Sequence, residues 1–315
     1  MDKKPELLVA SKSIAEFQLL AEVGIDAFVV GDARFAQCVR GSFTEVDLEG
    51  AIILAHSLEK KIYLLVDSIM PNALLVEFAT YLKGIKHFEF DAIRVADLGA
   101  YMLVKQIMPK MPVHFVDAMM LTNHYTVNYW ANQGMMRARL AHELTYDEVL
   151  EIKKLASPEI EVLIQGAPLM FTSRRKLVDN YLVFKRTIGK NMTIAKDGNF
   201  LFDEERDLHY PIIENEHGTH IYGGNDVCMI DDLGNLLDAG IDALYIESFT
   251  YEIEELVKIV QLYKMAIDLV AVDLKKYSKV GTALYAEVEK LQSRLRRADR
   301  GFYYKPTMYK NRQVN

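Results

Sequence analysis

Short apolar runs alternate with amphipathic helical patterns along most of the chain. We predict eight strands of four to six residues, at 6–10, 27–32, 62–67, 92–97, 113–117, 137–140, 160–165 and 243–247. Runs that are apolar almost throughout are typical of parallel strands that are covered on both faces. Eight strand–helix units favour a closed barrel over an open sheet, so we expect an α/β fold, a (β/α)8 TIM-like barrel.

The helical segments carry their own end signals. Residues 13–23 place Ile14, Phe17 and Leu20 at helical spacing and stop before Gly24, a residue type that suits the position after a helix. The element Gly-Ile-Asp-Ala occurs at 24–27 and again at 240–243. We interpret both copies as places where a helix ends and a buried strand begins, and therefore as stability features of the bottom face of the barrel.

The regular spacing breaks once, between Gln165 and Ala243, where nearly 80 residues contain no simple strand–helix unit. We interpret residues 167–222 as an insertion after the seventh strand, above the C-terminal mouth where barrel enzymes hold their active sites. Within it, residues 217–223 are a candidate hairpin strand. After it, Cys228 is expected to begin a helix that packs on the barrel.

The last part of the chain is predicted to be helical and basic. One helix is expected from Glu252 to about Ala271, and a second covers roughly 281–297. We therefore expect a barrel at residues 1–271, which includes the insertion, and a basic helical extension at 272–315.

Overall composition indicates an ordinary globular protein, with 50% hydrophobic and 26% charged residues and a net charge of −7. No apolar run approaches the roughly 20 residues of a membrane span, and the first residues lack signal-peptide features. The two cysteines, Cys38 and Cys228, cannot form a disulfide framework or a four-thiolate metal site. We expect a cytoplasmic protein without membrane contact.

Charge is distributed unevenly. Residues 275–315 hold 11 Lys/Arg and 3 Asp/Glu, a net of +8, so the rest of the chain carries −15. A basic arm on an acidic body could contact phosphates, or it could simply dock on that body. Both interpretations stay open.

Polar residues that end the predicted strands are the candidates for chemistry, because parallel strands bring their C-terminal ends together. Six strands end in Asp32, Asp67, Asp97, Asp117, Gln165 and Glu247. Others follow the fifth and sixth strands directly: Asn123, His124, Tyr125, His142 and Glu143. A ring of carboxylates and histidines could bind a divalent cation or transfer protons.

Structural roles compete with these catalytic ones. Strand-end carboxylates commonly cap the next helix or pair with arginines, here Arg34, Arg94, Arg174 or Arg175. Glu161, inside the seventh strand, could face the barrel interior or pair with Arg139. The sequence contains no GxSxG, HExxH, P-loop or strand-linked GxGxxG motif.

Several segments together resemble peptidase family U32, the collagenase-like proteases. The resemblance is carried by residues 159–170, by Ser173 to Leu177 and by the pair Asn180-Tyr181. Further segments follow in family order: 27–35, 123–130, 142–144, 225–228, 240–247 and 300–302. The resemblance therefore extends over essentially the whole chain.

The resemblance implies one of two activities. Some family members are described as proteases. Others act in oxygen-independent hydroxylation of the tRNA wobble uridine, of a ribosomal RNA cytidine or of a ubiquinone precursor. The hydroxylating members hold an iron–sulfur cluster on four cysteines, and the RNA-directed ones use prephenate as the apparent oxygen source.

This sequence departs from the family at the cluster. Leu169 and Lys176 occupy two family cysteine positions, and residues 203–209, ahead of Tyr210-Pro211, contain no cysteine for the other two. Leucine and lysine cannot replace thiolate ligands, so we predict that the chain holds no iron–sulfur cluster. A divalent metal remains possible.

Three functional hypotheses follow. In the first, the chain is the short, cluster-free paralogue in prephenate-dependent 5-hydroxylation of tRNA uridine 34 and works with a cysteine-bearing U32 paralogue. In the second it is a peptidase with a carboxylate/histidine site at the mouth, and in the third it is a non-catalytic scaffold. Whether the chain is itself an enzyme stays open.

Two sets of site residues accompany these hypotheses. The catalytic candidates are Asp117, His142, Glu143, Glu161 and Glu247. The candidates for binding substrate or tRNA are Arg34, Asn123, His124, Tyr125, Gln165, Arg174, Arg175, Lys176, Asn180 and Tyr181.

Overall fold

The computed structural model describes residues 4–37, 39–187, 199–292 and 296–305, so Cys38 lies outside the described residues. Eight parallel strands form the barrel: β1 (Glu6–Ala10), β2 (Ala27–Val30), β3 (Lys61–Val66), β4 (Ala92–Val95), β5 (Val113–Phe115), β6 (Arg137–Arg139), β7 (Glu159–Gly166) and β13 (Ala243–Ile246). The barrel closes because β13 pairs in parallel with both β1 and β7. This architecture confirms the predicted (β/α)8 TIM-like fold.

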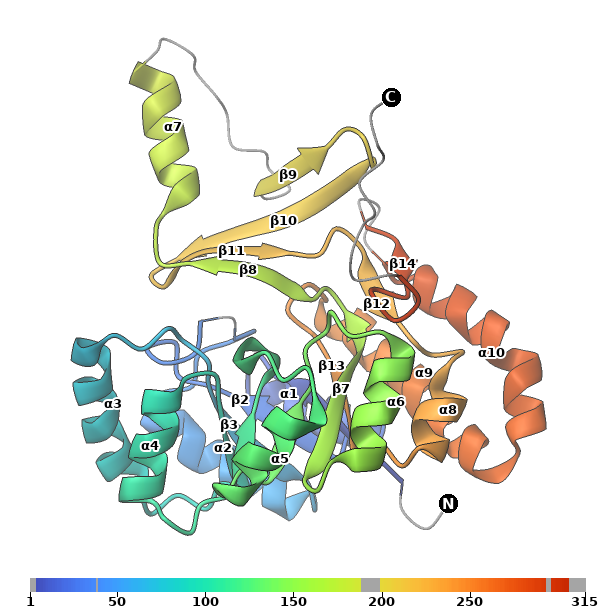
Figure 1. Cartoon of the computed structure of the whole chain (residues 1–315), viewed down its shortest axis with the longest axis horizontal. Coiled ribbons are helices and arrows are strands. Elements are labelled where there is room, and N and C mark those ends of the chain that lie inside the picture. Colours follow the sequence, from blue (N-terminus) through green and yellow to red (C-terminus); the bar gives the residue numbers. More distant parts are fainter. Residues whose placement is uncertain (1–3, 38, 188–198, 293–295, 306–315) are drawn as a thin grey trace.

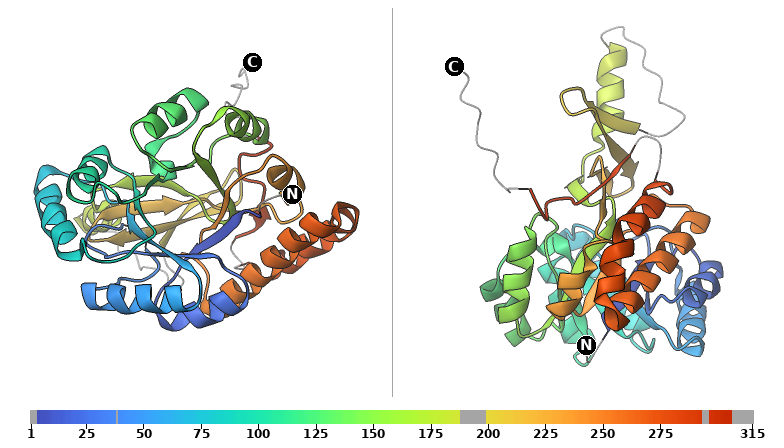
Figure 2. Two further views of the ribbon diagram at one scale, coloured as in Figure 1. Left: turned by 90° about the horizontal axis from the view of Figure 1, so that it is seen from below. Right: turned by 90° about the vertical axis from the view of Figure 1, so that its right-hand side faces the viewer.

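Helices surround the strands (Figure 2). They are α1 (Ala15–Glu22), α2 (Glu45–Ser57), α3 (Asn72–Ile85), α4 (Leu98–Ile107), α5 (His124–Asn132), α6 (Tyr146–Leu155), α8 (Leu233–Asp238) and α9 (Ile253–Val272), with a 3-10 turn, η1 (Asp117–Met119), after β5. Local sequence starts several of them: Thr44 and Thr145 form capping boxes on α2 and α6. Gly24 ends α1 with a φ of +100°, as expected for a residue that follows a helix.

The layer between strands and helices is apolar, whereas the barrel interior is polar. Phe28 on β2 packs against Phe17 on α1, with ring centroids 4.0 Å apart. The opposite faces of the strands carry buried polar side chains that include Arg94, Arg137 and Glu161. Barrel interiors are usually filled by branched apolar residues, so this interior needs charge compensation to be stable.

The insertion after β7 forms its own antiparallel sheet above the C-terminal end of the barrel (Figures 1 and 2). It contains β8 (Leu169–Ser173), α7 (Leu177–Thr187), β9 (Asn199–Asp203), β10 (Leu208–Asn215) and β11 (Gly218–Tyr222), with strand order β8-β11-β10-β9. The structure confirms the strand predicted within residues 217–223 as β11. The chain leaves the barrel at Gly166, with a φ of +101°, where a Cβ would lie 2.2 Å from the Glu247 carbonyl oxygen.

Two predictions after the insertion were wrong. Cys228 ends a strand, β12 (Asp226–Cys228), rather than beginning a helix, because β12 pairs with the end of β7 on one side and with β14 (Ala298–Asp299) on the other. The last helix, α10 (Leu274–Glu289), starts earlier than predicted because the Asp273 carboxylate accepts a hydrogen bond from the Lys276 backbone N–H and caps it.

Helix α9 packs between the barrel and α10 (Figure 1). No helix among the described residues is both long enough and apolar enough to cross a membrane.

Candidate functional site at the barrel mouth

A buried ion network fills the middle of the barrel. Arg94 on β4 donates two hydrogen bonds to Glu161 on β7, with N–O distances of 2.8 and 2.5 Å. Arg137 and Arg139, both on β6, place nitrogens 3.8 and 4.0 Å from the same carboxylate. Burial opposes ionisation of Glu161, but the three guanidinium groups outweigh it and lower its pKa.

This network places Glu161 in the barrel interior, one of the positions that the sequence left open. Its side chain has no exposed surface and its principal partner is Arg94, with Arg139 further away. Below it, Arg137 bridges Glu6 and Glu159 at 2.7 Å each. These contacts indicate that Glu161 stabilises the barrel rather than touching a substrate.

The mouth lies directly above this network, and its best-anchored acid is Asp117. Its Oδ2 atom lies 3.3 Å from Arg139 Nη2 and 3.4 Å from His142 Nδ1. Burial opposes ionisation here too, but Arg139 and His142 lower the pKa of Asp117 well below its usual range. The Arg139 guanidinium also lies 3.9 Å from the centre of the Tyr245 ring. Asp117 is therefore a fixed negative charge.

Two neighbouring carboxyls behave in the opposite way. Burial raises the pKa of Glu247 to about 7, and the charges of Asp117 and Asp67 contribute in the same direction. Burial likewise raises the pKa of Asp67 to about 6. A carboxyl that titrates near neutral pH can both give and take a proton, which general acid–base chemistry requires.

Two cavities with shared lining residues contain these groups. The inner cavity, of about 40 Å³, is bounded by Asp67, Asp117, Arg139 and Glu247, with Leu169 and Tyr222 from the insertion also lining it. The outer cavity, of about 300 Å³, shares Asp67, Asp117 and Leu169 with the inner one and adds further polar side chains: Asp97, His142 and Glu143. The structure thus brings together Asp117, His142, Glu143 and Glu247.

Other predicted site residues have structural surroundings. Gln165 is fully buried and hydrogen-bonds Tyr251 and Tyr263, which corrects the expectation that it points to the mouth. Arg34 makes a two-pronged ion pair with Asp32.

The predicted residues after the fifth strand belong to the start of α5. Asn123 caps this helix by accepting a hydrogen bond from the Thr126 backbone N–H. His124 and Tyr125 form its first turn, and the Tyr125 side chain is exposed. None of these three residues lines either mouth cavity.

The predicted binding residues of the insertion are exposed to solvent. Arg174, Arg175 and Lys176 join β8 to α7, and Asn180 and Tyr181 lie on α7 itself. Figure 1 shows this helix projecting away from the barrel. A helix with no buried residue is available for contact with a partner or RNA.

Sequence reasoning underrated the arginines of the mouth. Arg94 and Arg139 interrupt strands that are otherwise short and buried, and a charged residue in such a strand needs a buried partner. That signal could have placed an ion network inside the barrel. Tyr245 carried no comparable signal.

The residues present do not fit a four-cysteine iron–sulfur cluster. The 315 residues contain two cysteines, and Cys228 is buried beside Tyr263, with burial raising the pKa of its thiol to about 11. Leu169, at one family cysteine position, lines the mouth cavities instead. Among the described residues, no three His, Cys, Asp or Glu side chains are grouped so that they could hold a metal ion.

Comparison with known proteins identifies the family. The model of peptidase family U32 matches residues 12–313. tRNA hydroxylation protein P2 of Bacillus subtilis (strain 168) is 37% identical, over 98% of this chain and 100% of that protein. Protein P of Escherichia coli (strain K12) is 28% identical, over 84% of this chain and 68% of its own length, and protein P1 of B. subtilis is 23% identical, over 87% and 66%. The chain therefore belongs to peptidase family U32.

Proposed function

We propose that this chain takes part in prephenate-dependent 5-hydroxylation of the tRNA wobble uridine, together with a longer, cysteine-bearing U32 paralogue. The observation that carries the proposal is the 37% identity with tRNA hydroxylation protein P2 over the full length of that protein. Proteins P and P1 are matched over only about two thirds of their lengths. The chain thus corresponds to the short kind of relative.

The cysteine count supports a division of labour. With two cysteines, the chain cannot supply the four thiolates of the family cluster, so the paralogue would hold it. B. subtilis has relatives named both P1 and P2, which supports a paired system. The chain would contribute the acid–base groups of its mouth and the exposed cations of its insertion.

Proton handling is the chemical role that the mouth supports. Glu247 titrates near neutral pH, while Asp117 and Arg139 beside it hold fixed opposite charges. Because the two carboxyls have separated pKa values, Glu247 is suited to proton transfer and Asp117 to electrostatic orientation.

The experiment that tests this function is mass spectrometry of tRNA nucleosides from a strain of the source organism that lacks the gene. Growth without oxygen keeps oxygen-dependent hydroxylation routes silent. We expect loss of 5-hydroxyuridine-derived nucleosides, restored by the wild-type gene and not by Glu247→Gln. Unchanged nucleosides in the deletion strain would disprove the proposal.

The peptidase hypothesis rests on one observation, the contact of His142 with Asp117 beside Glu143 in the outer cavity. It would require the purified chain to cleave peptides and to lose that activity in His142→Ala. The scaffold hypothesis predicts that side chains fill the barrel mouth and leave no cavity there. The two cavities at the mouth disfavour this hypothesis.

A further inference from the structure

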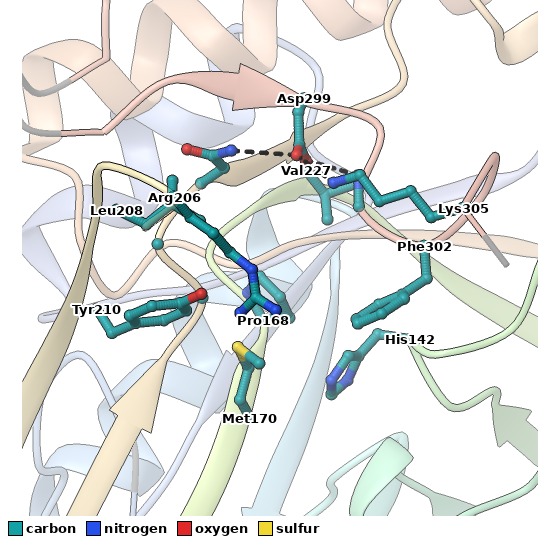
Figure 3. Close-up of a pocket in the computed structure, with 14 residues that line it drawn as sticks. His142, Pro168, Met170, Arg206, Leu208, Tyr210, Val227, Asp299, Phe302 and Lys305 are labelled. Atoms are coloured by element: carbon teal, nitrogen blue, oxygen red, sulfur yellow. Dashed lines mark hydrogen bonds and ion pairs between the residues drawn. The ribbon is translucent and has the colours of Figure 1, made fainter. Parts of the chain in front are cut away.

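A third pocket lies beside the mouth, and neither hypothesis for the mouth uses it. It has a volume of about 390 Å³, which falls in the range of small-ligand sites. Figure 3 shows it between the β9–β10 turn, the start of β8 and the C-terminal segment after β14. Residues 223–225, Val227 and His142 also line it, so five separate parts of the chain build the pocket.

Its walls are apolar and aromatic. Tyr210 on β10 and Phe302 after β14 lie on opposite sides of the pocket (Figure 3). Apolar side chains complete the walls: Pro168, Met170, Leu208 and Val227. Flat aromatic side chains with apolar neighbours are what single-stranded nucleic-acid sites offer to the faces of unstacked bases.

One side of the pocket is bare backbone. Gly223 and Gly224 line it, and a Cβ on Gly223 would lie 2.9 Å from a carbon of the Pro168 ring. A Cβ on Gly224 would lie 3.2 Å from the Leu208 Cβ. Larger residues here would displace the walls, so the glycines keep the pocket open.

Positive charge reaches into the pocket. The Arg206 side chain points into it (Figure 3), makes an ion pair with Asp203 at 3.2 Å and keeps 56% of its surface exposed. The acid in the lining, Asp299, is already paired with Lys305 at 2.6 Å and accepts a hydrogen bond from Asn225 at 3.1 Å. A phosphate beside Arg206 would therefore be attracted by its guanidinium group. Repulsion from Asp299 would be reduced, because Lys305 and Asn225 already pair with that carboxylate.

The pocket communicates with the mouth. His142 and Met170 line both this pocket and the outer mouth cavity. A ligand held here would lie beside His142, which in turn contacts Asp117. A group bound in this pocket would therefore lie next to the mouth.

We propose that this pocket receives one extruded nucleotide of a single-stranded RNA segment, with the base between Tyr210 and Phe302 and a phosphate at Arg206. The inference rests on the proposed function in taking the RNA to be tRNA. Enzymes that modify a base commonly hold it outside its stack in such a pocket.

The test is fluorescence anisotropy with a labelled short single-stranded RNA that has one central uridine, and with a twin that is abasic at that position. Both are measured with the full chain, alone and mixed with its paralogue. We expect the uridine RNA to bind roughly 5- to 150-fold more tightly than the abasic twin, the range expected for one stacked base. Tyr210→Ala should abolish this preference, and Tyr210→Phe should keep it because the ring remains.

Charge variants complete the test. Arg206→Ala should weaken binding of both RNAs and reduce the slope of log affinity against log salt concentration by about one. Lys154→Ala removes an exposed cation on α6, away from the pocket, and should change neither quantity.

The outcomes separate this inference from the proposed function. A preference for uridine that persists in Tyr210→Ala, or that wild type lacks both alone and with its paralogue, overturns the pocket assignment even if tRNA hydroxylation depends on the gene. A preference that depends on Tyr210 supports the pocket, even if the deletion strain keeps its nucleosides and the proposed function fails.

Discussion

At the scale of single residues, the barrel interior depends on compensated charge. Glu161 has no exposed surface and is held by Arg94 through two hydrogen bonds. Taking an ion out of water costs several kcal/mol, and the loss is offset only where partners are close and well oriented. Arg94 depends most on Glu161, because Arg137 also pairs with Glu6 and Glu159 and Arg139 also pairs with Asp117.

Glu161→Gln should therefore destabilise the fold strongly. Removing one partner leaves buried guanidinium charge uncompensated, for which about 3–5 kcal/mol of unfolding free energy is expected. Urea unfolding followed by circular dichroism measures it. Glu151→Gln, at an exposed position of α6, is the matched control and should change stability by less than about 0.5 kcal/mol. Equal stability of the two variants would contradict the network.

Glu247 should make stability depend on pH in a defined direction. Its pKa is about 7 in the folded chain against an ordinary value of 4.5, so folding binds a proton between those values. Stability from this group is full below about pH 4.5 and is lost as the pH rises through about 7.

Glu247→Gln removes this dependence. Relative to wild type, the variant should become more stable by roughly 1–3 kcal/mol between about pH 5 and pH 8, since each pKa unit is worth about 1.4 kcal/mol. Urea midpoints across that pH range measure the difference, with the exposed Glu205→Gln as control. A gap between variant and wild type that does not vary with pH would show that Glu247 is not protonated in the folded chain.

At the scale of elements, the insertion carries three exposed cations between β8 and α7, and we expect none of them to be needed for folding. Arg174, Arg175 and Lys176 are exposed, and α7 has no buried residue. Their replacement should leave the barrel intact and affect only what binds there.

Replacing Arg174, Arg175 and Lys176 by alanine should weaken tRNA binding most at low salt. If all three contact phosphates, the slope of log affinity against log salt concentration should fall by about 2 to 3. Anisotropy with labelled tRNA over a salt series measures it, and unfolding midpoints should stay at the wild-type value. An unchanged slope would show that these three side chains do not contact tRNA phosphates, and would favour a contact with the partner protein.

The C-terminal segment is fastened to the barrel by Arg300. Its guanidinium donates to the Cys228 carbonyl oxygen and to Asp231, at 2.6 Å each, and lies 4.4 Å from the centre of the Tyr285 ring. The described part of the basic tail thus docks on the acidic body, which favours the docking interpretation of its charge.

Arg300→Ala should lower the unfolding free energy by about 1.5–3 kcal/mol, because charge-assisted hydrogen bonds to half-buried groups are lost. Differential scanning calorimetry measures the shift. Its neighbour Arg297, with 82% of its side chain exposed, is the matched control, and Arg297→Ala should have almost no effect. Similar losses in both variants would show that Arg300 is not a special anchor.

At the scale of the whole molecule, the chain is one half of a proposed two-protein system. Purified alone, it should contain little iron and no iron–sulfide absorbance, because the four family cysteines are not available in it. Co-expressed with its paralogue, a complex should elute with iron that remains on the paralogue after separation. Stoichiometric iron on the isolated chain, by plasma mass spectrometry, would contradict the assignment.

Much of the fold could be predicted because barrel strands are local signals. Each of the eight predicted strands overlaps an observed one. A short apolar run between two helical patterns is typical of a buried strand. The helix predicted to begin at Cys228 was wrong because this segment forms strand β12, which pairs with β7, a strand distant in sequence. The start of α10 was missed because the Asp273 cap was overlooked.

The sequence by itself determined the barrel, the insertion after its seventh strand, the family and the set of polar residues near the strand ends. Only the tertiary structure decided which of these residues meet and in what state. Asp117 and Glu247 both follow barrel strands, yet their pKa values shift in opposite directions. Arg139 and His142 lower the pKa of Asp117 and keep it ionised, whereas burial raises the pKa of Glu247 to about 7. Electrostatic energy depends on distances and burial, and closure of the barrel sets both.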